Sequence, residues 1–155
     1  MLKIIQADSE EDLSQGRELL REYAASLGFD LHFQEFKKEV AGFPGEYSPP
    51  DGRFLLAQQD EKTAGCVAVR KISQGVCEMK RLYVRPEFRK KGVGRKLTEA
   101  IIEEARKMGY GHMRLDTVPF MKEAIALYGS LGFKEIESYR YNPIEGAKFM
   151  ELELS

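Results

Sequence analysis

Ligands for metal ions and partners for disulfides are scarce in this chain of 155 residues. It has two cysteines, Cys66 and Cys77, and two histidines, His32 and His112. The cysteine spacing matches no zinc-binding pattern and the histidines lie far apart, so the sequence predicts no metal site. Two cysteines also suit a reducing compartment, where thiols stay free. We therefore expect a cytoplasmic protein.

Long apolar runs and a dominant charge are lacking as well. No apolar segment approaches the roughly 20 residues that cross a bilayer, and the short apolar start, residues 1–6, does not resemble a signal peptide. The 24 basic and 25 acidic residues nearly cancel, giving a net charge of −1. The overall charge thus gives no sign of a nucleic-acid or membrane partner. The length suits a single domain covering residues 1–155.

Hydrophobic periodicity predicts an α/β fold. Alternating apolar residues indicate strands, and apolar residues three or four positions apart indicate helices. The stretch 42–52, rich in proline and glycine, is predicted as a long loop of the kind that often carries function. We expect a mixed, mostly antiparallel sheet of six or seven strands with helices on both faces. The expected strands are 3–7, 53–59, 64–71, 76–85, 112–117, 133–138 and 147–154, and the expected helices are 9–27, 34–41, 93–108 and 121–131.

Basic charge is concentrated where the third predicted helix begins. Between Lys80 and Lys96, eight basic residues stand against one acidic residue, a local net charge of +7. Gly92 and Gly94 open the helix, whose first N–H groups are unpaired and carry the positive end of the macrodipole. Glycines let a phosphate approach the backbone closely. The pattern favours a ligand with several phosphates, and the alternative is an ordinary solvated basic face.

Two common phosphate-binding loops do not fit this segment. The sequence has no Gly-x-x-x-x-Gly-Lys-Ser/Thr run, which excludes the Walker loop. A dinucleotide-binding fingerprint would need a third glycine where Leu97 stands and an acidic residue at the end of the next strand. The anion must therefore be held by another kind of loop.

Two motifs resemble the GNAT superfamily of N-acetyltransferases. The run Arg89-x-x-Gly92-x-Gly94 is similar to its pyrophosphate signature, Arg/Gln-x-x-Gly-x-Gly/Ala. The segment 124–133 is similar to its Ala-x-x-Leu-Tyr-x-x-x-Gly-Phe signature, and the order of elements agrees along nearly the whole chain. The ending, 141–152, resembles a bacterial subgroup whose substrates are mostly unassigned.

The resemblance implies acetyl-CoA as the donor and a primary amine of a small molecule or peptide as the acceptor. In the superfamily, the strand before the phosphate loop splays from its neighbour at a bulge, and the donor wedges into the gap. Main-chain groups of Leu82 and Val84 would pair with the pantetheine arm, and the N–H of Leu82 or Tyr83 would face the thioester carbonyl. The pyrophosphate would meet the backbone amides of Arg89, Lys90, Lys91, Gly92, Val93, Gly94 and Arg95.

Acetyl transfer to an amine needs a base for the ammonium group and an acid for the departing thiolate. The resemblance makes Tyr128 the candidate acid, whereas helical spacing alone would make it a core aromatic residue. Glu78 stands eleven positions before Arg89, the spacing of the base in histone-acetylating members, and its apolar neighbours are expected to raise its pKa. The alternatives are an ordered water as the base and a structural ion pair of Glu78 with Lys71 or Lys80.

The acceptor is expected between the first two helices and the last hairpin. Aromatic residues there indicate a partly enclosed pocket, and acidic ones, Asp30, Glu35 and Glu46, would attract a cation; their alternative is ordinary surface charge. Where many superfamily members have an asparagine, three residues before Ala124, this chain has Met121. The expected acceptor-side residues are Phe29, Asp30, His32, Phe33, Phe36, 47–52 and 139–142.

Two other functions stay open at this point. A non-catalytic acyl-CoA-binding regulatory module would keep the loop 89–94 without the chemistry. A nucleic-acid binder would need exposed aromatic residues among the basic ones, and Tyr83 and Phe88 are the only candidates. We expect neither nucleic acid nor a membrane as a partner, and the sequence leaves a homodimer open.

Overall fold

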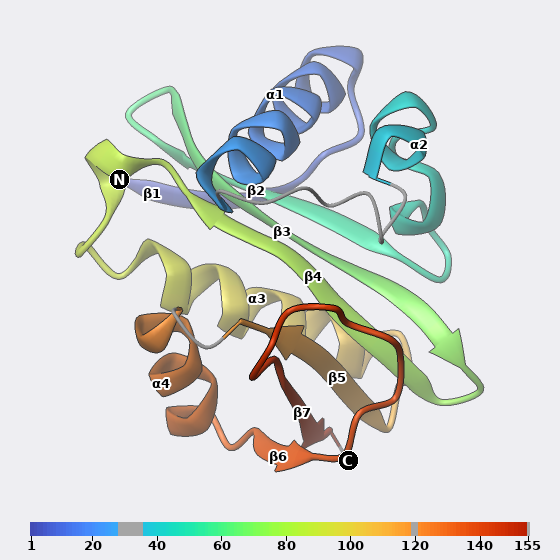
Figure 1. Ribbon diagram of the computed structural model, residues 1–155. Coiled ribbons are helices and arrows are strands. Elements are labelled where there is room, and N and C mark those ends of the chain that lie inside the picture. The colour runs from blue at the N-terminus through green and yellow to red at the C-terminus, as the bar shows by residue number, and fades with distance from the viewer. Residues whose placement is uncertain (28–35, 119–120, 155) are drawn as a thin grey trace.

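A twisted sheet with helices on both faces forms the fold (Figure 1). The computed structural model describes residues 1–27, 36–118 and 121–154. The helices are α1 (Glu10–Leu27), α2 (Phe36–Ala41), α3 (Val93–Lys107) and α4 (Lys122–Ser130), with short 3-10 turns η2 (Gly45–Tyr47) and η3 (Pro86–Phe88). The strands are β1 (Leu2–Gln6), β2 (Arg53–Gln59), β3 (Lys62–Ser73), β4 (Val76–Val84), β5 (His112–Thr117), β6 (Lys134–Ile136) and β7 (Lys148–Glu153).

The strands lie in the order β1-β2-β3-β4-β5-β7-β6. Every neighbouring pair is antiparallel except β4 and β5, which run parallel. The predicted fold class is therefore confirmed. The strand predicted over 133–138 ends at Ile136, and the residues that follow it, Tyr139 and Arg140, donate hydrogen bonds to Glu78 of β4.

Two hydrophobic cores hold the helices against the sheet. The strands send alternate side chains to each face, as the pleat requires. On one face, Leu19 and Leu20 of α1 pack on Phe54 and Leu56 of β2. On the other, α3 and α4 pack on the sheet through residues such as Leu97, Ile101, Met79, Leu115 and Tyr128. Strand β4 thus reaches both cores, which places its polar residues between the two layers of helices.

Strand β4 carries one of the two free, buried cysteines, and β3 carries the other. Cys77 pairs with Lys71 across the β3–β4 hairpin, and Cys66 pairs with Tyr83. Burial raises the pKa of the Cys77 thiol to about 12, so it stays protonated and unreactive at neutral pH. Among the described residues, no helix is both long and apolar enough to cross a membrane.

Candidate active site

Strand β4 has a bulge at Arg81. Lys80 and Tyr83 of β4 pair with Ala68 and Cys66 of β3, so β4 holds one residue more than β3 between these pairs. Arg81 has a φ of 62°, the left-handed conformation, which costs a residue with a Cβ roughly 1–2 kcal/mol. The bulge is the feature that the superfamily resemblance implies for this strand.

Contacts of the Arg81 side chain hold this conformation. Its guanidinium donates two hydrogen bonds of 2.8 Å to the carboxylate of Glu39 on α2. It also lies over the rings of Tyr23 and Phe36, at 5.6 and 5.4 Å from their centres. Because Arg81 is only 3% exposed, these interactions act in a medium of low polarity and fix α2 to the bulge.

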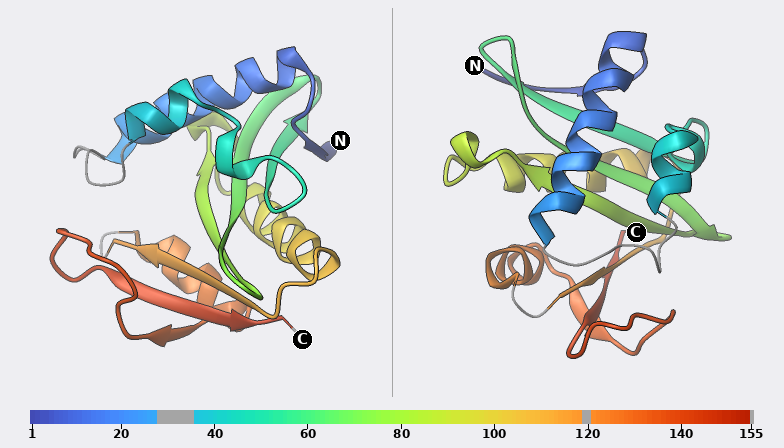
Figure 2. Two further views of the ribbon diagram at one scale, coloured as in Figure 1. Left: turned by 90° about the vertical axis from the view of Figure 1, so that its right-hand side faces the viewer. Right: turned by 45° about the horizontal axis from the view of Figure 1, so that its top comes forward.

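After Glu78, and so before the bulge, β4 separates from β5. The two strands pair only over Val76–Glu78 and His112–Arg114, and Figure 2 shows the two parts of the sheet diverging from there. A groove opens where they part. Its inner end is lined by Met79, Lys80, Arg81 and Leu82 of β4, Leu115, Asp116 and Thr117 of β5, and Val118, Asn142, Tyr128, Tyr23, Leu27, Met121 and Ala124.

The outer end of the groove is a cleft of about 690 Å³ that reaches the start of α3. It shares Tyr23, Leu82, Met121 and Ala124 with the inner end, so the groove is continuous. Met121, which stands where many superfamily members have asparagine, therefore lines the groove with an apolar side chain. Eight of the predicted donor-binding residues line the outer end: Leu82, Tyr83, Val84, Arg89, Lys90, Gly92, Val93 and Gly94.

The start of α3 has the geometry of an anion site. No side chain caps this end, and the first turn contains no acidic residue. Lys90 and Gly92 have φ values of 64° and 79°, left-handed conformations of the kind that occur in anion-binding nests of backbone N–H groups. A Cβ added to Gly94 would meet nothing nearer than a methyl group of Val84 at 3.8 Å, so the space before the helix is open. These features fit a pyrophosphate.

The hydroxyl of Tyr128 belongs to the inner end of the groove. The residue is 6% exposed, and its ring packs on Phe133 with 5.7 Å between ring centres. Burial, with smaller effects of Tyr23 and Asp116, raises the pKa of the Tyr128 phenol. The hydroxyl is therefore protonated at neutral pH, the form that a proton donor to a thiolate requires.

A model of the acetyltransferase (GNAT) family matches residues 14–133. The chain belongs to this family. An uncharacterised N-acetyltransferase of Schizosaccharomyces pombe is 44% identical over 147 residues, covering 94% of this chain and 90% of that protein. Another, of Dictyostelium discoideum, is 31% identical and covers 99% of both chains. The PaiA N-acetyltransferase of Thermoplasma acidophilum, solved with coenzyme A, has a TM-score of 0.75 at 22% identity and covers 99% of each chain.

Membership of the GNAT family decides the reaction type. The protein is an N-acetyltransferase with acetyl-CoA as its donor, and a non-catalytic module is not favoured. The narrower resemblance to a bacterial subgroup is not supported, because the two relatives just described, which cover nearly the whole chain at 31% identity or more, are eukaryotic.

The second catalytic candidate, Glu78, is fully buried and does not line the groove of this GNAT protein. Arg70 donates to one carboxylate oxygen at 2.9 Å, and Tyr139 at 2.6 Å and Arg140 donate to the other. Burial alone would raise the pKa of Glu78, but the charges of Lys80 and Arg140 and these hydrogen bonds outweigh it, so the pKa is lowered. The expected upward shift is therefore wrong, because that expectation rested on burial among apolar neighbours and left out the charges and hydrogen bonds around the carboxylate.

Two of the basic residues that were predicted to surround the phosphates form ion pairs with other helices instead. Arg85 donates to both carboxylate oxygens of Glu22 on α1, at 2.9 to 3.2 Å, and Arg81 is bound to Glu39 on α2. These two arginines face α1 and α2. The local charge of +7 thus overstates the charge at the phosphate loop, where binding of a phosphate would depend more on the backbone amides.

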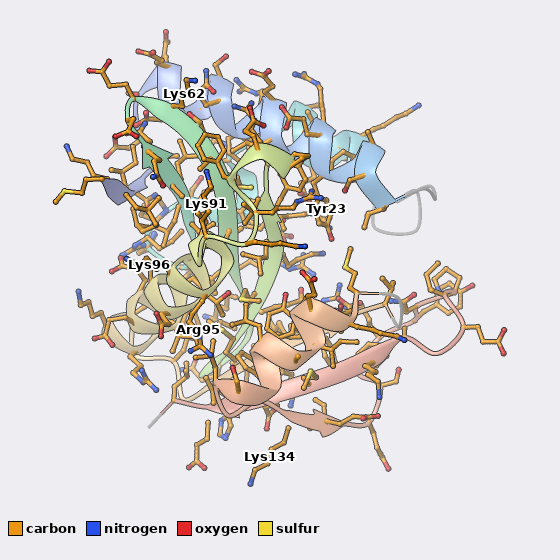
Figure 3. All side chains as sticks on the ribbon, turned by 90° about the vertical axis from the view of Figure 1, so that its left-hand side faces the viewer. Tyr23, Lys62, Lys91, Arg95, Lys96 and Lys134 are labelled. Atoms are coloured by element: carbon orange, nitrogen blue, oxygen red, sulfur yellow. The ribbon has the colours of Figure 1, made fainter. Side chains whose placement is uncertain are left out.

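Two side chains of the phosphate loop do not line the groove of the GNAT structure, and a third, Arg89, lines it while bonded to the main chain. Lys91 and Arg95 are predicted to contact the donor but are not among the groove-lining residues. Figure 3 shows both at the start of α3, where Arg95 donates to Ser130 of α4 at 2.8 Å. Arg89 donates to the carbonyl oxygen of Val84 at 2.8 Å. Any role of Lys91 or Arg95 in binding the donor is therefore one for the main chain.

Two charged residues at the inner end, Lys80 and Asp116, belong to no motif recognised in the sequence. Lys80 is 8% exposed, and burial together with the charges of neighbouring arginines lowers its pKa to about 7. Asp116 accepts a hydrogen bond of 3.2 Å from the side-chain amide of Asn142. Only the alternation of β4, which puts Lys80 on the same face as Glu78, could have pointed to the lysine.

The acceptor side differs in part from expectation. Asn142 lines the groove, whereas Phe36 packs on Arg81, and Glu46 is bound to Arg70. Tyr47 is buried in the core beneath α1. The predictions for Phe29, Asp30, His32, Phe33 and Glu35 fall outside the described residues.

Replacing Glu39 should show how much the bulge depends on its ion pair. We expect Glu39→Gln to lower the free energy of unfolding by roughly 1–3 kcal/mol, because it leaves a buried guanidinium without its counter-charge. Urea unfolding would measure the loss. Lys37→Gln, on the exposed side of α2, is the control and should leave stability nearly unchanged. Equal stabilities of the two variants would contradict this role of Glu39.

Proposed function

We propose that the protein transfers the acetyl group of acetyl-CoA to a primary amine on a small molecule or a peptide. The observation that carries the proposal is the continuous groove between the uncapped start of α3 and Tyr128. One end suits phosphates, and the other holds a phenol that stays protonated. Acetyl-CoA supplies an activated acetyl group as a thioester, and its two ends require these two environments.

Donor binding is assigned to main-chain groups. The amides of residues 89–95 hold the pyrophosphate, which the left-handed conformations of Lys90 and Gly92 support. Leu82 and Val84 pair with the pantetheine arm along the part of β4 that β5 leaves unpaired. Arg89 has to release the carbonyl of Val84 for this pairing, which frees its guanidinium to meet a phosphate.

The chemistry is assigned to groups at the inner end of the groove. Tyr128 gives its proton to the departing thiolate, while the backbone N–H of Leu82 or Tyr83 donates to the thioester oxygen as it gains negative charge. The proton of the attacking amine needs a base. The two candidates from the sequence are Glu78 and an ordered water.

Thiol release from acetyl-CoA tests the proposed reaction. A panel of amines, amino acids and peptides would be compared with the same compounds already acetylated on the amine. We expect release above background only with free primary amines, together with a product that is heavier by one acetyl group. Saturable binding of acetyl-CoA without release on any amine would favour the acyl-CoA-binding module instead.

The pH dependence of Glu78→Gln distinguishes the roles of this carboxylate. A base matters most where the acceptor is protonated, so loss of the base would reduce the rate mainly at low pH and less as the pH approaches the amine pKa. A carboxylate that only anchors Tyr139 and Arg140 would reduce it by the same factor at every pH.

A further inference from the structure

Among the described residues, Lys80 is the only lysine that lines the inner end of the groove. Lys80 lines the same part of the groove as Tyr128 and Asp116, directly before the bulge of β4. Resting on the proposed function, we infer that Lys80 is the catalytic base and that its ε-amine accepts the proton of the acceptor amine. Glu78 is then a positioning residue.

Access separates the two candidates. Glu78 is fully enclosed, and each of its carboxylate oxygens already accepts a hydrogen bond from a side chain. Two of its donors, Tyr139 and Arg140, come from the segment between β6 and β7 and lie over it. Lys80 retains contact with the groove, where an acceptor amine would have to lie near Tyr128.

Charge favours the same assignment. Burial and the positive charges of nearby arginines lower the pKa of Lys80 to about 7, and Glu78 opposes them only in part. A base works best when its pKa lies near the working pH, whereas the lowered pKa of Glu78 makes it a weaker proton acceptor. The groups around Lys80 are Glu78 and Arg81 on β4, Arg70 on β3, Asp116 on β5, Glu39 on α2, Tyr23 on α1 and Arg140 after β6.

The proposed step balances without another reactant. The nitrogen of the acceptor bonds to the thioester carbon as its proton passes to the neutral amine of Lys80. The carbon–sulfur bond then breaks, and the sulfur takes the proton of Tyr128. Lys80 loses its extra proton to water, and the phenolate of Tyr128 regains one. The net products are the acetylated amine and the free thiol of coenzyme A.

Two substitutions separate a base from a cation. Lys80→Arg keeps the positive charge but cannot lose its proton at any working pH, and Lys80→Met keeps the length without the charge. We expect both to lower kcat by roughly 100-fold or more and to remove the rise of kcat near neutral pH. The rise in melting temperature caused by acetyl-CoA should persist in both, which shows that the fold and the donor site survive. Glu78→Gln should move the rise of kcat to lower pH, because the charge of Glu78 keeps the pKa of Lys80 from falling further; if Glu78 were the base, its loss would instead reduce the rate mainly at low pH.

A direct titration decides the protonation state even without an acceptor. In protein labelled with ¹³C at the lysine ε-carbon, the Lys80 signal is the one that Lys80→Arg removes. We expect its midpoint near 7, against about 10.4 for ordinary lysines. A midpoint near 10 would overturn the inference. So would a Lys80→Arg enzyme with wild-type kcat and pH profile. An unmodified protein that releases no thiol with any amine would instead refute the proposed function.

Discussion

We expect Gly94→Glu to abolish the rise in melting temperature that acetyl-CoA produces. A ligand that binds only the folded state stabilises it by roughly 2.7 kcal/mol when the ligand concentration is 100 times Kd. For a domain of this size that raises the melting temperature by about 5–10 °C. Gly94 lines the open space before α3, so a glutamate there would place bulk and negative charge against the pyrophosphate. Differential scanning fluorimetry with and without acetyl-CoA would measure the shift.

Gly94→Ala is the matched control for that variant. Its Cβ would lie 3.8 Å from the nearest methyl group of Val84, an ordinary contact, so most of the shift should remain. The glutamate variant should stay folded, because an acidic residue in the first turn of α3 interacts favourably with the helix dipole. A full shift with Gly94→Glu would show that the phosphates bind elsewhere.

We expect Tyr128→Phe to reduce kcat by roughly 10- to 1,000-fold while the affinity for acetyl-CoA barely changes. The substitution removes only the hydroxyl that would protonate the leaving thiolate. The ring still packs on Phe133, so the fold should survive. Steady-state kinetics with a verified acceptor would provide kcat, and the acetyl-CoA titration would provide Kd.

The control variant Tyr110→Phe should show the opposite pattern, lower stability with unchanged kcat. Tyr110 is also buried, but its hydroxyl donates to the carbonyl oxygen of Asp51 at 2.6 Å, and it does not line the groove. Its loss should lower stability by about 1 kcal/mol and leave kcat unchanged. If Tyr128→Phe kept full kcat, Tyr128 would be a core residue, as helical spacing alone suggests.

The fold could be predicted because local patterns determine most of it. Alternation in β5 and helical spacing in α3 mark which faces are buried, and the apolar runs of β2 and β3 mark strands that are buried on both faces. The outer end of the groove could be predicted for a similar reason, because Arg89 to Gly94 form one short motif. In both cases the information lies within a few consecutive residues.

The inner end could not be predicted in the same way, because its properties come from distant residues. The pKa of Glu78 is lowered by the charge of the nearby Lys80 but also by Arg140 and Tyr139, which stand about sixty positions along the chain. The pKa of Lys80 depends on arginines from three separate segments. The left-handed Arg81 depends on Glu39 in α2. Such effects exist only once the chain is folded.

The hydrogen bonds between Arg81 and Glu39 connect α2 to the strand that lines the donor groove. Arg81 sits at the bulge that directs Leu82 and Val84 toward the groove, so a displacement of α2 would be transmitted to the edge of β4. If an acceptor shifts α2 on binding and thereby changes the affinity for acetyl-CoA, thermodynamic linkage requires that acetyl-CoA change the affinity for the acceptor by the same factor. One buried arginine would then set the cooperativity between the two substrates.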